Sequence, residues 1–279
     1  MKNAMQLKAL MKNIAKEKNI PAQVVLQNYM FERLLERIAK SKYRENFIIK
    51  GGFLISAIVG LDTRTTMDID ATIKGMKLDK DTTIKMFKEI CEINISDKVV
   101  FEIKDVSEIR ESEDYTGLRI AMNAIFQKII TPLKLDLTTG DKITPREVEF
   151  EYKLFSNDQV LKVLSYNKET ILAEKLETIV SRGVQTTRPR DYYDVYILHK
   201  LVWDEISINI LKEALLATAR NRESEKYITN YKEIFSEIKN DNSMINQWDK
   251  YRKSFSYANN IVFNEVCETV ESILDGIFK

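Results

Sequence analysis

The chain has 279 residues, of which 44% are hydrophobic and 30% charged, a composition typical of globular proteins and unlike that of disordered or fibrous chains. This length allows two modest domains, each with its own apolar core. The 43 basic and 42 acidic residues leave a formal net charge of +1, which excludes nucleic-acid binding by a uniformly basic surface and requires a local basic patch for any such contact.

The sequence lacks the residues for two common kinds of site, a zinc site and a Ser-His-Asp triad. Cys91 and Cys267 form no CxxC pair and His199 is the single histidine, so neither a zinc site nor a Ser-His-Asp triad can be built. The first residues are interrupted by lysines, unlike a signal peptide, and no apolar run approaches the ~18 residues that span a bilayer. We therefore expect a cytoplasmic protein without a membrane segment.

The first forty residues have the periodicity of helices. Apolar side chains recur at steps of three and four, at Leu7, Leu10, Met11 and Ile14. Pro21 suits the start of a second helix, because the fixed φ of proline matches the first helical turn. We expect this second helix to end near Lys40.

Short runs rich in β-forming residues follow, and they predict a mixed α/β block with one helix at 79–93. The runs are FIIK (47–50), MDIDATI (67–73), VVFEIKDV (99–106), LRIAMNAIF (118–126), PLKLDLTT (132–139) and VEFEYKLF (148–155). After about Ser165 the pattern becomes helical again, with helices predicted at 169–183, 188–200 and 206–219 and more before the end. The predicted domains are 1–165, with N-terminal helices and an α/β sheet, and 166–279, which is helical.

Two aspartates close the segment GGFLISAIVGLDTRTTMDID (51–70). Because successive side chains of a strand point to opposite faces, Asp68, Asp70 and Thr72 are predicted to share one face, with Met67 on the other. Two carboxylates with this spacing can bind Mg²⁺, which prefers oxygen ligands and keeps positions open for phosphates. A solvated polar face of an edge strand would give the same short D-x-D pattern.

Gly51 and Gly52 lie between a predicted strand and a predicted helix. A turn without Cβ atoms lets the backbone N–H groups of a helix N-terminus approach a phosphate closely. A strand-to-helix turn that needs positive φ explains the pair nearly as well. The combination of this turn with R-x-T-x-D-x-D at 64–70 favours a site for a triphosphate and a metal ion.

This arrangement resembles the nucleotidyltransferase superfamily that includes DNA polymerase beta, in which a glycine turn and a D-x-D strand are joined by a third acid on a neighbouring strand. In PLKLDLTTG, leucines alternate with Lys134 and Asp136, so Asp136 is predicted to project from the polar face as that third acid. Asp105 and Asp141 are the alternatives, each at the end of a run. The resemblance implies an α/β (α+β) fold, a mixed sheet with N-terminal helices and a C-terminal helical domain.

A second resemblance covers the whole chain. The segment ILAEKLETIVSRGVQTTRPRDYYDVYIL (171–198) looks like a conserved region of the AbiEii/AbiGii toxin family, nucleotidyltransferase-like abortive-infection toxins that include the MenT type. The segment RTTMDID (64–70) looks like that family's R-x-[ST]-x-D-[IVL]-D motif. Thr66 stands where many relatives have serine and keeps the hydroxyl group.

The family resemblance implies the roles of several residues. Lys175 and Asp191 would complete the catalytic set with Asp68 and Asp70, and Asp136 is included as a catalytic candidate although its position is less regular in these toxins. The expected metal ligands are Asp68 and Asp70, and the expected nucleotide-binding residues are Gly51, Gly52, Arg64, Thr66 and Lys175. The expected cofactor is Mg²⁺ or Mn²⁺, with an NTP as substrate.

Local chemistry leaves alternatives for the helical half. Lys175 can neutralise phosphate charge, or it can be an ordinary solvated lysine. Asp191 can orient or deprotonate an acceptor, or it can only favour the first turn of a helix that begins at Pro189. A cluster of arginines and tyrosines can hold a phosphate backbone and stack a base, or it can be partly core. Its members are Arg182, Arg188, Arg190, Tyr192, Tyr193 and Tyr196.

By resemblance, the function is that of a metal-dependent nucleotidyltransferase toxin in an AbiE-like toxin-antitoxin and phage-defence system. Such an enzyme would transfer NMP from an NTP to an acceptor hydroxyl, with the 3′ end of tRNA as the expected acceptor and a separately encoded AbiEi-like antitoxin as the expected partner. Two alternatives stay open. One is an enzyme of the same fold with a small-molecule or protein acceptor, and the other is an NTP-binding regulator without transferase activity.

Overall fold

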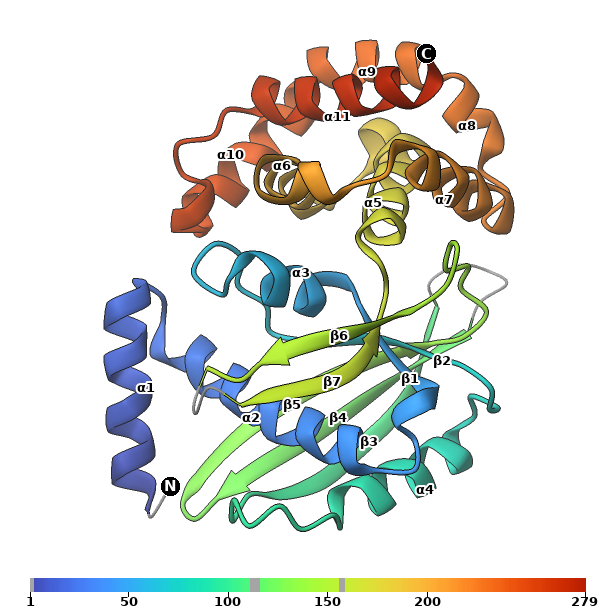
Figure 1. Ribbon diagram of the computed structural model, residues 1–279. Helices are drawn as coiled ribbons and strands as arrows, with labels where there is room; N and C mark the ends of the chain where they lie inside the picture. The colour runs from blue at the N-terminus through green and yellow to red at the C-terminus, as the bar shows by residue number, and fades with distance from the viewer. Residues whose placement is uncertain (1–2, 111–115, 156–158) are drawn as a thin grey trace. The chain divides into compact units, whose positions relative to one another are not determined.

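The structure is a computed structural model that describes residues 3–110, 116–155 and 159–279. The chain divides into two compact units (Figure 1). The first unit comprises Met1–Gly140 and Val148–Ser165, and the second comprises Asp141–Glu147 and Tyr166–Lys279. The short segment Asp141–Glu147 therefore belongs with the helices that follow it in sequence and not with the sheet.

The described part of the first unit contains a seven-stranded mixed sheet with the order β3-β4-β5-β2-β1-β7-β6. Neighbouring strands are antiparallel except for two parallel pairs, β1 with β7 and β2 with β5. The strands are β1 (Phe47–Lys50), β2 (Ile69–Ile73), β3 (Val100–Arg110), β4 (Thr116–Phe126), β5 (Ile129–Thr138), β6 (Val148–Lys153) and β7 (Val160–Ser165). The expected α/β fold with a mixed sheet is confirmed.

Side-chain alternation explains the central strands. On β5 the leucines at 133, 135 and 137 are buried, whereas Lys134 between them is exposed. On β2 the apolar residues are buried in the same way, but the strand begins only at Ile69. Met67 and Asp68 therefore both precede the strand. Met67 is 44% exposed, so its predicted place on the apolar face is wrong, and strand alternation does not place Asp68 on a face with Asp70. Strand β7 was not predicted; it pairs with β6 in the antiparallel sense over its whole length and with β1 in the parallel sense.

Four helices pack around this sheet. Helix α2 packs against β5 and β7, α3 against β1 and β2, and α4 against β3, while α1 packs against α2 (Figure 1). The helices are α1 (Ala4–Lys18), α2 (Ala22–Lys40), α3 (Gly51–Val59) and α4 (Lys80–Cys91). Pro21 is the N-cap residue of α2, as its sequence position predicts. Their apolar faces and the sheet form the core of the first unit.

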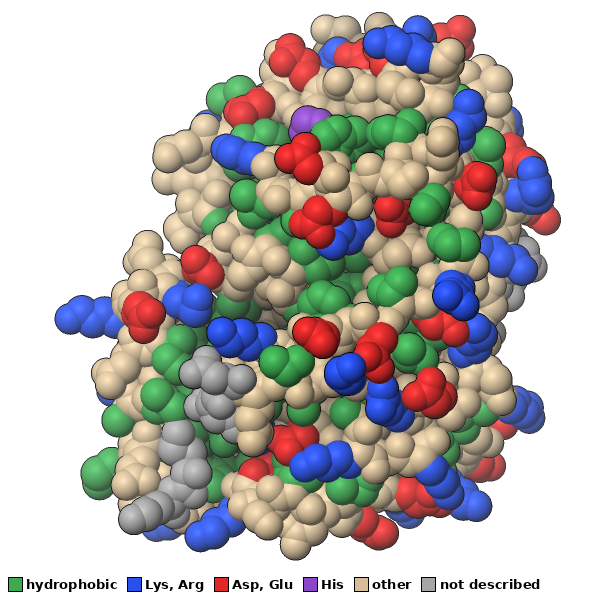
Figure 2. Space-filling view, viewed as in Figure 1, with side chains coloured by type: hydrophobic (Ala, Val, Ile, Leu, Met, Phe, Trp, Pro, Cys, Tyr) green, Lys and Arg blue, Asp and Glu red, His purple; other side chains and the backbone are tan. Residues whose placement is uncertain are grey.

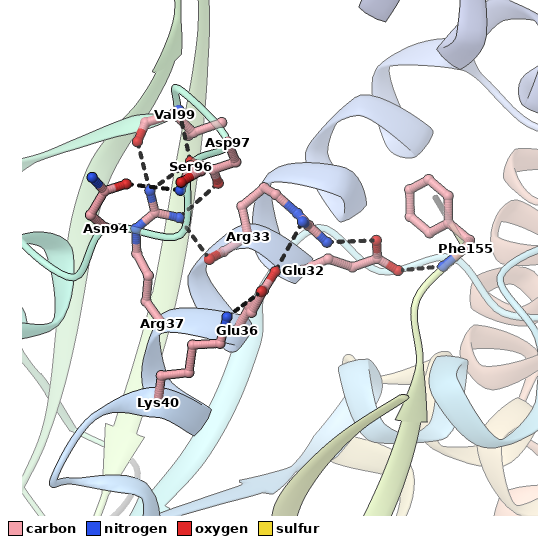
Figure 3. A network of polar contacts seen from close by, with 10 residues as sticks. All are labelled: Glu32, Arg33, Glu36, Arg37, Lys40, Asn94, Ser96, Asp97, Val99 and Phe155. Atoms are coloured by element: carbon pink, nitrogen blue, oxygen red, sulfur yellow. Dashed lines mark hydrogen bonds and ion pairs between the residues drawn. The ribbon is translucent and has the colours of Figure 1, made fainter. Parts of the chain in front are cut away.

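A network of buried charges fixes α2 in place (Figure 3). Arg37 donates both Nη atoms to the two carboxylate oxygens of Asp97 at 2.8 Å, and its Nη2 also donates to the Val99 carbonyl. One turn away, the Glu32 Oε1 atom accepts a hydrogen bond from the Phe155 backbone N–H at 2.9 Å. Because these partners come from distant segments, they hold α2 in one position relative to the sheet.

The second unit is helical in its described residues. Its helices are α5 (Lys168–Arg182), α6 (Pro189–Val202), α7 (Ile208–Asn221), α8 (Glu225–Thr229), α9 (Tyr231–Asn240), α10 (Asn242–Ser254) and α11 (Phe263–Phe278). Short 3-10 helices lie at Arg44–Asn46 in the first unit and at Gly183–Gln185, Trp203–Glu205 and Ser256–Ala258 in the second. Asn167 caps α5 by accepting from the Thr170 N–H, and Pro189 occupies the first turn of α6.

The surface charge is mixed, as the composition predicts. On the face drawn in Figure 2, Lys and Arg side chains are interspersed with Asp and Glu side chains. Any nucleic-acid contact on this face must therefore rely on a few arginines or lysines. Among the described residues, no helix combines the length and the apolar character that a membrane crossing requires.

Candidate functional site

The turn between β1 and α3 holds the carboxylate of Asp70. Gly51 begins α3 with a φ of +63°, a conformation that favours glycine. A Cβ atom on Gly51 would overlap the Asp70 Oδ2 atom and lie 2.8 Å from its Cγ atom. The Asp70 carboxylate therefore occupies the space that a side chain at position 51 would fill, directly beside the N-terminus of α3.

The second glycine of the turn makes room for another part of the motif. A Cβ atom on Gly52 would lie 2.9 Å from Arg64 Nη2 and 3.4 Å from Thr66 Oγ1. Arg64 is only 1% exposed and donates its Nη1 to the Thr65 carbonyl, while Thr66 Oγ1 donates to the Asp68 carbonyl at 3.1 Å. Because Arg64 and Thr66 are buried, their contacts position the turn and the backbone of the D-x-D motif.

Two residues of α2 that sequence analysis missed hold the same loop. Gln27 Nε2 donates to the Met67 carbonyl at 2.8 Å, and Asn28 Nδ2 donates to the Thr66 carbonyl at 3.3 Å. Both side chains are buried. The available signal was the presence of polar residues at buried positions of an otherwise amphipathic helix. This signal does not identify their hydrogen-bond partners, which lie about forty positions further along the chain.

The third predicted acid lies beside Asp70. In the parallel pair of β2 and β5, Asp70 is in register with Asp136, so both side chains lie on the same face of the sheet. Asp136 accepts two hydrogen bonds from Arg119 on β4, from Nε at 2.7 Å and from Nη2 at 2.6 Å. These bonds raise the pKa of the Arg119 guanidinium, and the charges of Asp68 and Asp70 contribute to the same shift.

The residues present fit a magnesium ion that is shared with a triphosphate. Within residues 3–110, 116–155 and 159–279, no group of three or more His, Cys, Asp and Glu side chains is arranged to hold a metal ion. Asp68 and Asp70 supply two carboxylates, and Mg²⁺ is commonly bound through one or two carboxylates together with substrate phosphates and water. The donor set therefore suits an ion that arrives with its nucleotide.

The cavity found in the first unit is separate from these acids. Its volume is about 390 Å³, and it is lined mainly by α2, α3 and the end of β6, through residues such as Asn28, Phe53, Ser56 and Tyr152. Neither Asp68, Asp70 nor Asp136 lines it. The assignment of the nucleotide site therefore rests on the turn and the acids.

Replacing Gly51 with alanine should disrupt this arrangement. The new Cβ atom would displace the Asp70 carboxylate and strain a backbone with positive φ, so we expect a loss of about 1–3 kcal/mol in the free energy of unfolding. Binding of an NTP should also weaken. Gly276→Ala is the control, because its Cβ meets nothing within 4 Å in helix α11, and it should be neutral or stabilising. Equal behaviour of the two variants in urea unfolding and NTP binding would contradict this account of the turn.

The second unit contains a buried cluster of one lysine and two aspartates. Lys175 on α5 lies 2.5 Å from Asp191 Oδ1 and 3.2 Å from Asp194 Oδ2, both on α6. The carboxylate side chains are 6% and 0% exposed, and that of Lys175 is 18% exposed. Lys175 is therefore not an ordinary solvated lysine, and Asp191 does more than favour a helix terminus.

The arginines and tyrosines of α6 and its approach have different environments. Arg182 and Arg188 are exposed, whereas Arg190 places its guanidinium 5.7 Å from the centre of the Phe255 ring. Partial desolvation of the Arg182 guanidinium lowers its pKa although the residue as a whole is exposed, and the charge of Arg188 lowers this pKa further. The three tyrosines are buried, at 0%, 1% and 8% exposure for Tyr192, Tyr193 and Tyr196, so the idea that they stack a base is wrong. They form part of the helical core because α10 and α11 cover them.

The remaining residues singled out from sequence have other environments. Asp105 is exposed on β3, at the edge of the sheet, and Asp141 belongs to the second unit. Burial raises the pKa of the thiols of Cys91 and Cys267 to about 11 and about 12, so both are inert at neutral pH. His199 packs against Trp203.

Solved structures with the same fold come from Helicobacter pylori. One, described as a candidate nucleotidyltransferase, has 15% sequence identity and a TM-score of 0.57, covering 92% of this chain and 96% of that chain. The other, JHP933, has 16% identity and a TM-score of 0.53, covering 91% of each chain. No curated protein matches the chain.

The sequence profile described as "Nucleotidyl transferase AbiEii toxin, Type IV TA system" matches residues 33–275. This match includes the Gly-Gly turn, the R-x-T-x-D-x-D segment and the Lys175 cluster. The chain belongs to the AbiEii family of nucleotidyltransferase toxins from type IV toxin-antitoxin systems.

Proposed function

We propose that the first unit binds an NTP together with Mg²⁺ at the Gly51-Gly52 turn and that the protein transfers the NMP group to an acceptor hydroxyl. The observation that carries this proposal is the position of Asp70, whose carboxylate fills the space left by Gly51 at the start of α3. Backbone N–H groups at a helix N-terminus favour phosphate, and the adjacent carboxylates favour a cation. The N–H groups of the turn thus suit the triphosphate, and the adjacent carboxylates suit the magnesium ion.

The reaction is an in-line displacement at the α-phosphorus. The acceptor oxygen forms the new bond to phosphorus, the bond to the β-phosphate bridging oxygen breaks, and pyrophosphate leaves. Asp68 and Asp70 would hold Mg²⁺, which when bound supplies neutralisation of the developing phosphate charge. The turn fixes the triphosphate, and Gln27, Asn28, Arg64 and Thr66 fix the loop that carries the acids.

Lys175 and Asp191 are proposed to contribute from the second unit. Asp191 is the candidate for orienting the acceptor hydroxyl or accepting its proton, and its ion pair with Lys175 orients the carboxylate. By the family resemblance, Lys175 is also proposed to bind phosphates. A structural contribution of the same lysine follows from its buried partners, and stability measurements separate the two roles.

The proposed acceptor is the 3′ end of tRNA, and the proposed setting is phage defence with an AbiEi-like antitoxin. Two exposed arginines of the second unit, Arg182 and Arg188, support a phosphate-backbone contact, because both carry a positive charge and face solvent. Their contribution should fall with rising salt concentration.

Transfer assays with α-³²P-labelled NTPs test this proposal. Each of the four NTPs is incubated with Mg²⁺ and total tRNA, and in parallel with protein and small hydroxylated acceptors. We expect pyrophosphate release and a label on the 3′ end of tRNA. A label on a protein or small molecule would replace tRNA as the acceptor. Binding of an NTP without pyrophosphate release for any acceptor would contradict transferase activity and favour a regulator.

A further inference from the structure

Four charged residues form one row across the sheet. The strand registers pair Arg119 on β4 with Asp136 on β5, Asp136 with Asp70 on β2, and Asp70 with Lys50 on β1. Neighbouring strands are about 4.8 Å apart, and paired residues point to the same face. The row therefore runs from Lys50, the N-cap residue of α3, past the two acids to Arg119.

Within this row Asp136 is already occupied by Arg119. Both of its oxygens accept N–H groups, at 2.7 and 2.6 Å, in the bidentate geometry that gives the strongest arginine–carboxylate contacts. A divalent cation on the same carboxylate would have to lie beside a guanidinium that is always charged. Asp136 is therefore poorly placed to ligate a metal ion while it holds Arg119.

Arg119 has donors that Asp136 does not use. Guanidinium carries five N–H groups, and the Asp136 contact takes one from Nε and one from Nη2. The Arg119 side chain is 43% exposed, whereas that of Asp136 is 13% exposed. Part of the Arg119 side chain is thus exposed on the face of the sheet that carries Asp70.

We propose that Arg119 is a phosphate-binding residue of the nucleotide site and that Asp136 is the residue that positions it. This inference rests on the proposed function, because it needs a triphosphate at the Gly51-Gly52 turn. A triphosphate that begins at the turn and follows the row of charges would reach Arg119, whose planar fork suits phosphate oxygens. The third acid of this chain then acts through an arginine and not through a metal ion.

Binding measurements on Arg119→Gln separate this role from others. The probe is inorganic triphosphate in saturating Mn²⁺, measured by calorimetry, since it carries the phosphates and no base. We expect Arg119→Gln to bind this probe roughly tenfold more weakly. Its affinity for Mn²⁺ alone, measured by electron paramagnetic resonance, should be equal or higher, because a positive charge beside Asp68 and Asp70 is removed.

Asp136→Asn should weaken the same probe while leaving Mn²⁺ bound, and the double variant should bind no more weakly than Arg119→Gln. Arg44→Gln is the matched control, because Arg44 forms a 2.8 Å ion pair with Glu149 in the same unit and should leave probe binding unchanged. Unchanged probe binding by Arg119→Gln, or loss of Mn²⁺ binding by Asp136→Asn, would overturn the inference. If the wild-type protein binds neither Mn²⁺ nor the probe, the proposed function fails as well.

Discussion

Replacing Asp70 with asparagine is expected to lower the rate of nucleotidyl transfer by about a thousandfold or more, at saturating NTP. The amide keeps the size of the carboxylate but loses the charge that binds a divalent cation. Since Asp70 already lies against the Gly51 turn, the variant should fold normally and retain its urea midpoint. The rate is measured as pyrophosphate release in the presence of the preferred acceptor.

Asp105→Asn provides the matched control for this variant. Asp105 is an exposed aspartate on β3 of the same sheet, away from the glycine turn. Its replacement should leave the rate within about twofold of the wild-type value, as is usual for exposed positions. A similar loss of rate in both variants, or full activity of Asp70→Asn, would remove Asp70 from the catalytic site.

The Lys175→Met variant should lose about 3 kcal/mol or more from the free energy of unfolding of the second unit. The substitution leaves Asp191 and Asp194 as buried carboxylates without their ammonium partner. Urea unfolding followed by tryptophan fluorescence reports this unit selectively, because Trp203 and Trp248, the two tryptophans of the chain, both belong to it.

Lys168→Met is the control, since Lys168 forms a 2.8 Å ion pair with the exposed Glu205 in the same unit. Exposed pairs contribute about 1 kcal/mol at most, so this variant should unfold near the wild-type midpoint. Equal stability of the two variants would show that the Lys175 cluster is not structural. Because Lys175→Met is expected to be unstable, any loss of its activity has to be corrected for the folded fraction before it is attributed to phosphate binding.

Local rules made part of the site predictable. The need for glycine at positive φ singles out Gly51, and strand alternation places Asp136 on the polar face of β5. Both depend on residues close in sequence. The helices that begin at Pro21 and Pro189 were predictable for the same reason, since their start signals are local.

The other contacts of the site could not be predicted, because they join residues that are far apart in the sequence. Arg119 alternates with buried apolar residues on β4, but only the register of β4 with β5 pairs it with Asp136. Likewise Gln27 contacts a loop about forty residues away, which no local pattern indicates. The sequence left open whether the tyrosines of α6 stack a base or belong to the core, because the helices that bury them come later in the chain.

The most direct test of the central claim is a crystal structure with Mn²⁺ and a non-hydrolysable NTP analogue, using the anomalous signal of the metal. We predict a Mn²⁺ ion ligated by oxygens of Asp68 and Asp70 at about 2.1 Å, with the triphosphate against the backbone of Gly51 and Gly52. A metal ion and triphosphate bound elsewhere on the chain, with these two carboxylates left out of the coordination, would contradict it.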